Sequence, residues 1–245
     1  MVVGDLLKNP IAHRGLHGLN APENSLAAFE AAARAGYAIE LDAQIIASGE
    51  MIVFHDQTLE RLCGVRGAVR DLQLKDMDAI RLIGGEKVPL LREVFERIKT
   101  PIYLEIKSDL SYGKAERTRL VTAVLELLNE FRPNAIAASF DRKLLALFRR
   151  RSPEIMLGII SEDDTPNLAL FEAIAPKFVS VSLPSLPLWK EAMIGKNLPL
   201  IAWTAHNETE SAQALIYADQ VVFEGFLPPV SGDLQRTQTA SCEDV

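Results

Sequence analysis

Short runs of apolar and β-branched residues alternate along this chain with longer segments in which apolar residues recur at helical spacing. Short apolar runs bounded by turn residues are typical of buried strands, and the helical spacing is typical of amphipathic helices. Strands that alternate with helices form a parallel sheet. The pattern predicts eight strands, at Pro10–His13, Ile39–Ala43, Ile102–Ile106, Ala135–Ser139, Ile155–Ile160, Phe178–Ser182, Leu200–Thr204 and Gln220–Phe223.

Helices are predicted between these strands. The first is capped by Asn24 or Ser25 and ends at Gly36, a residue that suits the end of a helix. Eight strands in 245 residues favour a closed (β/α)8 TIM barrel, an α/β fold, over an open doubly wound sheet, because no glycine-rich phosphate loop opens a helix. The other helices are expected at Leu90–Lys99, Tyr112–Phe131, Asp141–Arg151, Asn167–Ile174, Leu186–Gly195 and Glu208–Tyr217.

The regular alternation weakens between Gln57 and Leu91. This stretch is long for a connection between a strand and a helix. Its pattern predicts a loop at Cys63–Gly67 and one short helix at Asp71–Leu82. We interpret residues 57–91 as a small insertion over one mouth of the barrel, within a single domain of residues 1–228. The polar residues 229–245 are expected to form a loose C-terminal tail.

The composition indicates which binding partners and which cellular compartment the protein is expected to have. A net charge of −7 argues against non-specific binding to nucleic acid or to acidic membranes. No apolar run approaches the roughly 20 residues that span a bilayer, and the N-terminus is too short and too polar for a signal peptide. Cys63 and Cys242 lie far apart and are most simply free thiols in a reducing compartment. We therefore expect a cytoplasmic protein with no stable membrane association.

The segment Ile39–Asp56 combines two β-rich stretches with a turn at Ser48-Gly49-Glu50. Folded about this turn, a hairpin brings Asp42 close to opposite His55. Glu40 shares a strand face with Asp42, because alternate residues of a strand point the same way. Burying unpaired carboxylates is costly, so this concentration of charge in an apolar segment indicates a functional site rather than an ordinary core strand.

Other unusual polar residues fall at or just beyond the predicted strand ends, where barrels place their functional groups. The carboxylates Glu40, Asp42 and Glu105 suit a hard divalent cation such as Mg²⁺ or Ca²⁺, which takes oxygen ligands. The histidines His13 and His55 are natural acid and base groups near neutral pH. The same strand ends also carry Lys107, Trp203 and Glu224.

Structural roles compete with some of these assignments. The carboxylates of the hairpin can instead be bonded to backbone amides or to Arg14. Lys107 can pair with a neighbouring carboxylate without touching a substrate. Trp203 can fill the core or form a wall against an apolar part of the substrate. His17 and His206 are weaker candidates for catalysis, since one lies in a predicted loop and the other just past a strand.

Seven short motifs follow one another along the chain: His13-Arg14-Gly15, Pro22-Glu23-Asn24-Ser25, Glu40-Leu41-Asp42, Val53-Phe54-His55-Asp56, Glu105-Ile106-Lys107, Ser139-Phe140 and Trp203-Thr204. The series covers nearly the whole chain and resembles the glycerophosphodiester phosphodiesterase family. One departure is at the last strand, where many members have Thr-Asp-x-Pro and this chain has Phe223-Glu224-Gly225-Phe226. The carboxylate is kept there, but it is one methylene longer.

The resemblance implies a TIM-type barrel that hydrolyses a small-molecule substrate, a glycerophosphodiester, to glycerol 3-phosphate and an alcohol. It also implies a divalent cation, Mg²⁺ or Ca²⁺, bound by the three carboxylates Glu40, Asp42 and Glu105, with His13 and His55 as the acid/base pair. Arg14 and Lys107 would steady the phosphate, and Trp203 and Glu224 are expected at the substrate. A glycerol hydroxyl next to the phosphate is expected to attack first.

Three rival functions follow from the same residues. Lys107 at a strand end can form a Schiff base, as in barrel aldolases, although the paired histidines would then be surplus. A barrel that only binds phosphodiesters would not need His13 or His55 for affinity. A phospholipase D-like relative would act on choline lipids and should show an exposed apolar rim, and the acidic composition disfavours its docking to a membrane.

Overall fold

Eight parallel strands close into a barrel in the computed structural model, which describes residues 3–18, 21–109, 111–162 and 169–231. Neighbours in the sheet follow the order of the chain, and β1 pairs with both β9 and β2, which joins the first strand to the last. The predicted (β/α)8 TIM barrel is confirmed. Its strands are β1 (Ile11–Ala12), β2 (Ala38–Ile45), β4 (Ile102–Ile106), β5 (Ala135–Ser139), β6 (Leu157–Ser161), β7 (Phe178–Ser182), β8 (Leu200–Ala205) and β9 (Gln220–Phe223).

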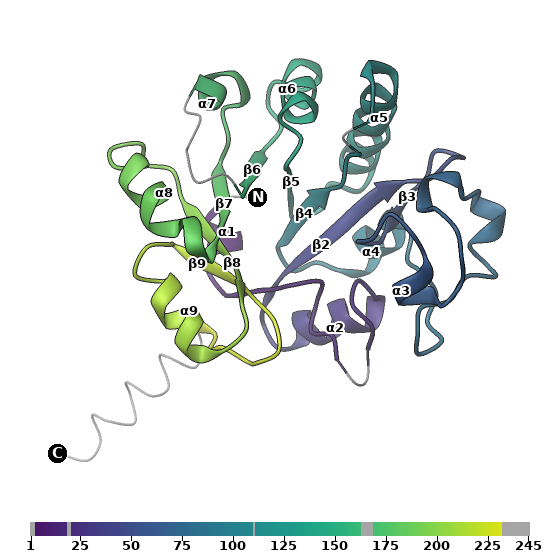
Figure 1. Cartoon of the computed structure of the whole chain (residues 1–245), viewed down its shortest axis with the longest axis horizontal. Helices are drawn as coiled ribbons and strands as arrows, with labels where there is room; N and C mark the ends of the chain where they lie inside the picture. The colour runs from purple at the N-terminus through teal and green to yellow at the C-terminus, as the bar shows by residue number, and fades with distance from the viewer. Residues whose placement is uncertain (1–2, 19–20, 110, 163–168, 232–245) are drawn as a thin grey trace, which may run out of the picture.

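Helices lie around the outside of these strands, as Figure 1 shows. Their apolar faces and the outer faces of the strands form one continuous core. The helices agree with the predicted ones to within a few residues at each end, although the first two residues of the helix predicted at Asn167–Ile174 lie outside the described residues. They are α2 (Leu26–Arg34), α4 (Leu91–Arg97), α5 (Lys114–Phe131), α6 (Arg142–Arg151), α7 (Ala169–Ile174), α8 (Leu186–Ala192) and α9 (Glu208–Ala214). The 3₁₀ helix η3 (Leu183–Ser185), which leads into α8, was not predicted.

A short helix that the sequence pattern did not predict, α1 (Val3–Leu7), closes the N-terminal end of the barrel. Leu6 is fully buried among the side chains that fill the barrel interior. Gln220, the first residue of β9, donates from Nε2 to the Leu7 carbonyl at 3.0 Å. Five residues are too few for a helical period to stand out in a sequence. This end of the barrel is therefore plugged, and the open end is the opposite one.

Gly158 on β6 lies where the barrel interior has no room for a side chain. A Cβ built at this position would lie 2.3 Å from Phe178 Cζ on the neighbouring strand β7. We expect Gly158→Ala to lower the free energy of unfolding by roughly 1–3 kcal/mol, the usual cost of overpacking a core. Urea unfolding measures this loss. Gly4→Ala is the matched control, because a Cβ there meets nothing within 4 Å and alanine favours the helix α1. Equal stabilities of the two variants would contradict this prediction.

The predicted hairpin is formed by the end of β2 and by β3 (Met51–Val53). Strand β1 has only two residues and pairs with β2 at Ala38 and Ile39, so the edge of β2 beyond that point is left for β3. Ala43 pairs with Val53, which makes Phe54 the residue opposite Asp42. The predicted register, with His55 close to opposite Asp42, is therefore off by one residue. His55 enters the site just after β3 has ended.

The segment after His55 packs beside the hairpin around a small apolar core of its own. It contains α3 (Glu60–Cys63) and two 3₁₀ helices, η1 (Val69–Asp71) and η2 (Leu74–Asp76). The single helix predicted at Asp71–Leu82 is wrong. Leu72 and Gln73 are extended, and Asp76 Oδ2 accepts from the Gln73 backbone N–H at 2.9 Å, which stabilises a new turn instead of a continuing helix.

The expectations about membrane spans, cysteines and the C-terminal tail can be compared with the structure only within the described residues. No helix of the described residues is long and apolar enough to cross a membrane. Cys63 is a free thiol, and burial raises its pKa to about 11. Cys242 and all but the first three residues of the predicted tail lie outside the described residues. The division into one domain and a tail stays a prediction.

Candidate active site

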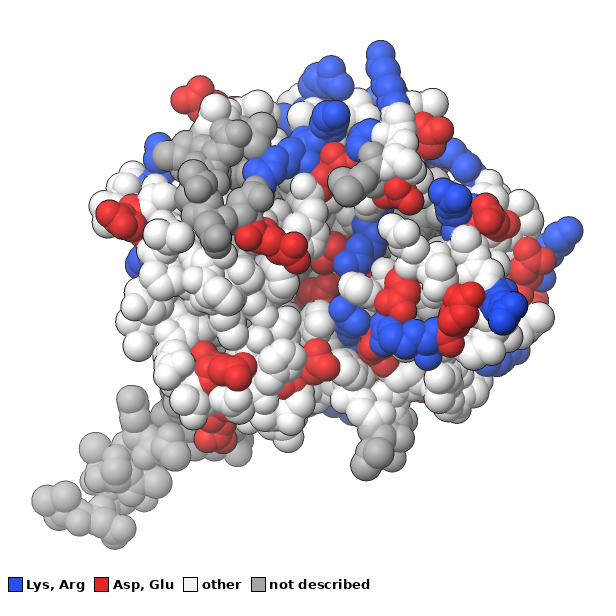
Figure 2. Space-filling model, in the orientation of Figure 1, with Lys and Arg blue, Asp and Glu red and all other residues white. Residues whose placement is uncertain are grey.

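A cavity of about 270 Å³ opens at the C-terminal ends of the strands. Acidic and basic side chains lie together in a hollow near the middle of the face shown in Figure 2. Eight of the nine site residues predicted from the sequence line the cavity, and the ninth, Glu224, bonds to one of them. The eight are His13, Arg14, Glu40, Asp42, His55, Glu105, Lys107 and Trp203.

Three carboxylates gather in this cavity. Glu40 and Asp42 come from β2, and Glu105 comes from β4, where it lies beside Asp42 in the parallel register. One oxygen of each lies within 4.8 Å of the others, and all three side chains are buried. Burial, together with its two acidic neighbours, raises the pKa of Glu40 well above its usual value, and burial and Asp42 raise the pKa of Glu105 to about 7. This crowded set of oxygen donors could hold a divalent cation.

Two cationic side chains offset part of this negative charge. Lys107 Nζ lies 2.9 Å from Asp42 Oδ1 and 2.6 Å from Glu105 Oε1. Arg14 donates its backbone N–H to Glu40 at 2.9 Å, and its Nε lies 3.3 Å from Asp42 Oδ2. Although burial alone would raise the pKa of Asp42, the nearby positive charges, above all Lys107, hold it well below its usual value. The ion pairs that the sequence offered as structural alternatives are thus present within the site.

Asn24 holds Asp42 from the loop before α2. Its Nδ2 donates to Asp42 Oδ2 at 2.9 Å, and its Oδ1 accepts from the Asp42 backbone N–H at 3.2 Å. Asn24 is fully buried and has a φ of 57°, a left-handed conformation that asparagine tolerates better than most residues. Ser25 is the residue that caps α2, since its Oγ accepts from Ala28 N. Asn24, predicted only as a candidate cap, is therefore a site residue.

Each predicted catalytic histidine is held by a carboxylate. His13 Nδ1 lies 2.6 Å from Glu224 Oε2, and His55 Nδ1 lies 2.8 Å from Asp56 Oδ1. The bond from His13 lowers the pKa of Glu224 to about 2, so the carboxylate accepts and Nδ1 carries the proton. Nε2 is then the nitrogen that can exchange protons with a substrate. Glu224, expected at the substrate, contacts His13 instead of lining the cavity.

A chain of ion pairs connects the loop after β1 with the segment that carries His55. Arg14 Nη1 bonds to Glu23 Oε1 at 2.6 Å. Arg61 of α3 binds both Glu23 and Asp56, at distances of 2.6 to 2.8 Å. Since Asp56 holds the His55 ring, the segment after the hairpin helps to place that histidine.

Gln44 holds the same segment from β2. Its Nε2 lies 2.8, 3.0 and 2.7 Å from the backbone carbonyl oxygens of Phe54, His55 and Asp56. Gln44 was not predicted as a site residue. A signal was present, because Gln44 continues the polar face of β2 that begins with Glu40 and Asp42.

Residues 13–223 match the model of the Glycerophosphoryl diester phosphodiesterase family. The chain belongs to this family. The putative glycerophosphodiester phosphodiesterase YhdW of Bacillus subtilis is 30% identical over 223 residues, which cover 83% of this chain and 88% of that protein. A glycerophosphodiester phosphodiesterase of Caldanaerobacter subterraneus is 35% identical over 161 residues, 61% of this chain and 65% of that one. A lysophospholipase D of Rattus norvegicus is 28% identical, and the match covers 80% of this chain and 68% of that one.

Solved structures of similar proteins show the same fold for this family member. An Oleispira antarctica phosphodiesterase, in complex with the product sn-glycerol-3-phosphate, superposes with a TM-score of 0.79 at 22% identity, over 87% of this chain and 91% of that chain. A glycerophosphodiester phosphodiesterase of Thermotoga maritima superposes with a TM-score of 0.69 at 26% identity, over 87% of this chain and 92% of that chain.

Trp203 and Phe140 form one wall of the cavity in this phosphodiesterase family member. Their rings meet edge to face, with centroids 5.8 Å apart. Trp203 also packs against the apolar cluster that fills the barrel, which is one of the two alternatives, and its contact with a substrate stays a prediction. His17 and His206 are not among the described residues that line the cavity, although His17 Nε2 lies 3.7 Å from Glu224 Oε1.

Proposed function

We propose that this family member hydrolyses glycerophosphodiesters to glycerol 3-phosphate and an alcohol, with the help of a divalent cation. The observation that carries the proposal is the placement of two carboxylate-held histidines on the same cavity as three clustered carboxylates. Cleaving a phosphodiester requires that negative charge be neutralised and that two protons be moved. The cavity offers groups for both tasks, and the names of the relatives support the same activity.

Glu40, Asp42 and Glu105 would hold the cation. A donor set made of oxygen atoms fits Mg²⁺ or Ca²⁺. The ammonium group of Lys107 already lies among these carboxylates, which supports a preference for positive charge at this place. When bound, such a cation polarises a phosphoryl oxygen and lowers the pKa of a coordinated hydroxyl.

His13 and His55 would divide the proton transfers. One takes the proton of a glycerol hydroxyl as its oxygen bonds to phosphorus, and the other gives a proton to the alcohol oxygen as its bond to phosphorus breaks. This step yields a cyclic glycerol phosphate and the free alcohol, and water then opens the ring with the two roles reversed. Arg14 and Lys107 add positive charge beside the phosphate. Their carboxylate partners hold both side chains against the cavity.

The decisive experiment measures the release of glycerol 3-phosphate from glycerophosphocholine and glycerophosphoethanolamine. We expect release that stops with a chelator and returns when Mg²⁺ or Ca²⁺ is added back. Activity that is indifferent to the chelator would contradict the cation assignment, and an absence of release would contradict the function. In a single turnover, a cyclic phosphate supports attack by the glycerol hydroxyl, whereas entry of solvent oxygen in the first step contradicts it.

A further inference from the structure

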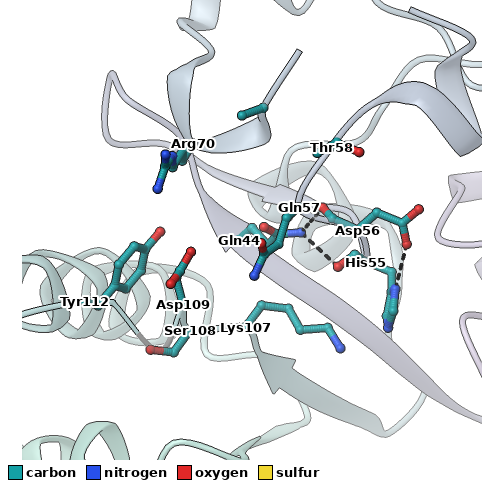
Figure 3. A pocket seen from close by; sticks show the side chains of 11 residues that line it. Gln44, His55, Asp56, Gln57, Thr58, Arg70, Lys107, Ser108, Asp109 and Tyr112 are labelled. Carbon is teal, nitrogen blue, oxygen red and sulfur yellow. Dashed lines mark hydrogen bonds and ion pairs between the residues drawn. The ribbon is translucent and has the colours of Figure 1, made fainter. Parts of the chain in front are cut away.

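A second pocket, of about 620 Å³, adjoins the cavity that contains the carboxylates. His55 and Lys107 line both hollows. In Figure 3, Arg70, Asp109 and Tyr112 lie on one side of the pocket and His55 lies on the other. These side chains come from the stretch after β3, from η1 and from the connection between β4 and α5. A substrate phosphate beside His55 and Lys107 would therefore have this pocket next to it.

Most residues that line this pocket are of polar type, and their charges are balanced. Asp56 is already paired with Arg61, and Lys107 is paired with the carboxylate cluster. Two further lining groups, Arg70 and Asp109, carry opposite charges and so favour neither an anion nor a cation. Arg70 Nε lies 3.9 Å from Asp71 Oδ1, and Asp109 Oδ1 accepts from the Ser111 backbone N–H at 2.7 Å. The described residues that line the pocket include no leucine, isoleucine, valine or phenylalanine. An acyl chain would find no aliphatic side chain larger than Ala68 among them.

We propose, building on the function proposed above, that this pocket binds the alcohol part of the substrate and prefers a polyhydroxylated alcohol. The carboxylate of Asp109 accepts from hydroxyl groups, and the guanidinium of Arg70 donates to them. The side-chain amide of Gln57 can do both. The ring of Tyr112 offers a flat surface to the C–H face of a cyclic polyol. A quaternary ammonium group carries no hydroxyl that could bond to these side chains.

This assignment also separates the roles of the two histidines. His55 lines the proposed alcohol pocket, whereas His13 lines only the cavity with the carboxylates. With the alcohol in this pocket, the leaving oxygen lies on the His55 side of the phosphate. His55 then gives its proton to the alcohol, and His13, held by Glu224, takes the proton of the glycerol hydroxyl.

The test compares kcat/KM of the full chain for glycerophosphoinositol and glycerophosphocholine with the activating cation present. We expect a preference of roughly tenfold or more for the inositol diester, because its hydroxyls bond to charged groups. Asp109→Ala and Arg70→Ala should each remove roughly tenfold from kcat/KM for the inositol diester, and they should lower it more for this diester than for the choline diester. Arg66→Ala is the matched control, an exposed arginine of the same segment that does not line the pocket.

Retained hydrolysis of glycerophosphocholine shows that the variants are folded, so a loss confined to the inositol diester supports the pocket. Equal kcat/KM for the two substrates, or variant effects that fall on both alike, would overturn the role of the pocket and leave the proposed hydrolysis intact. A preference for lysophosphatidylcholine would also overturn it. Failure of the wild-type chain to hydrolyse any of these diesters would overturn the proposed function and the pocket assignment together.

Discussion

His55→Ala is expected to lower kcat for a glycerophosphodiester by roughly 10²–10⁴-fold, and His13→Ala is expected to do the same. Each ring lines the cavity and has its Nδ1 held by a carboxylate, which leaves Nε2 for proton transfer. In the proposed mechanism each histidine serves one of the two oxygens at phosphorus, so neither is expected to replace the other. Steady-state kinetics at saturating cation and substrate measure the loss.

Two further variants show whether the loss belongs to proton transfer. Glu224→Gln should lower kcat by less than His13→Ala, because the His13 ring remains and loses only its charged partner. His206→Ala is the control, since His206 is exposed and does not line the cavity, and it should keep the full rate. A normal rate in both His13→Ala and His55→Ala would refute the assignment and favour a barrel that only binds phosphodiesters.

Binding of Mg²⁺ or Ca²⁺ is expected to weaken as the pH falls below about 7. Burial and Asp42 raise the pKa of Glu105 to about 7, so below that pH a cation must displace a proton from Glu105 in order to bind. The apparent affinity for the cation should then fall by up to roughly tenfold for each pH unit below 7. Without a cation, Glu105 is protonated in the folded chain between pH 4.5 and about 7, whereas in the unfolded chain it is ionised over that range. The stabilisation from Glu105 is therefore complete below its usual pKa of 4.5 and is lost as the pH rises to about 7.

Calorimetric titration at pH values on either side of neutrality, in two buffers of different ionisation heat, measures both the affinity and the protons released. Glu105→Gln should bind the cation more weakly at each pH and should show a shallower dependence on pH. Glu40 still contributes in that variant, because burial raises its pKa as well. Wild-type affinity that does not change with pH, or a Glu105→Gln variant that binds as tightly, would contradict the assignment of Glu105 as a ligand.

The site was predictable wherever it depended on residue type and position along a strand. His13, Glu105 and Lys107 stand at strand ends that the apolar pattern marks, and a parallel barrel brings all its strand ends to one mouth. Glu40 and Asp42 share a face because alternate residues of β2 do so in any register. These arguments use only the position of each residue within its own strand, so they do not require knowing which residues contact one another in the folded protein.

Contacts across the barrel were not predictable in the same way. His13 and Glu224 are 211 residues apart, and they meet because β1 and β9 are neighbours in the closed sheet. Asn24 looked equivalent to Ser25 as a helix cap until its left-handed backbone placed its amide on Asp42. Such choices are decided by hydrogen bonds of about 1 kcal/mol each, which no periodicity in the sequence records.

The sequence by itself determined the barrel, the set of residues at its open mouth and the type of chemistry they can perform. Apolar periodicity indicates which faces of the strands and helices must be buried, and burial is the largest favourable contribution to folding. The order of strands and helices can therefore be predicted from the sequence pattern. The tertiary structure alone decided which carboxylate holds which histidine, the one-residue offset between Asp42 and His55, and the polar pocket beside them. Those features depend on barrel closure and on side-chain geometry. Differences of about 1 kcal/mol in hydrogen bonding decide between arrangements that the sequence pattern does not distinguish.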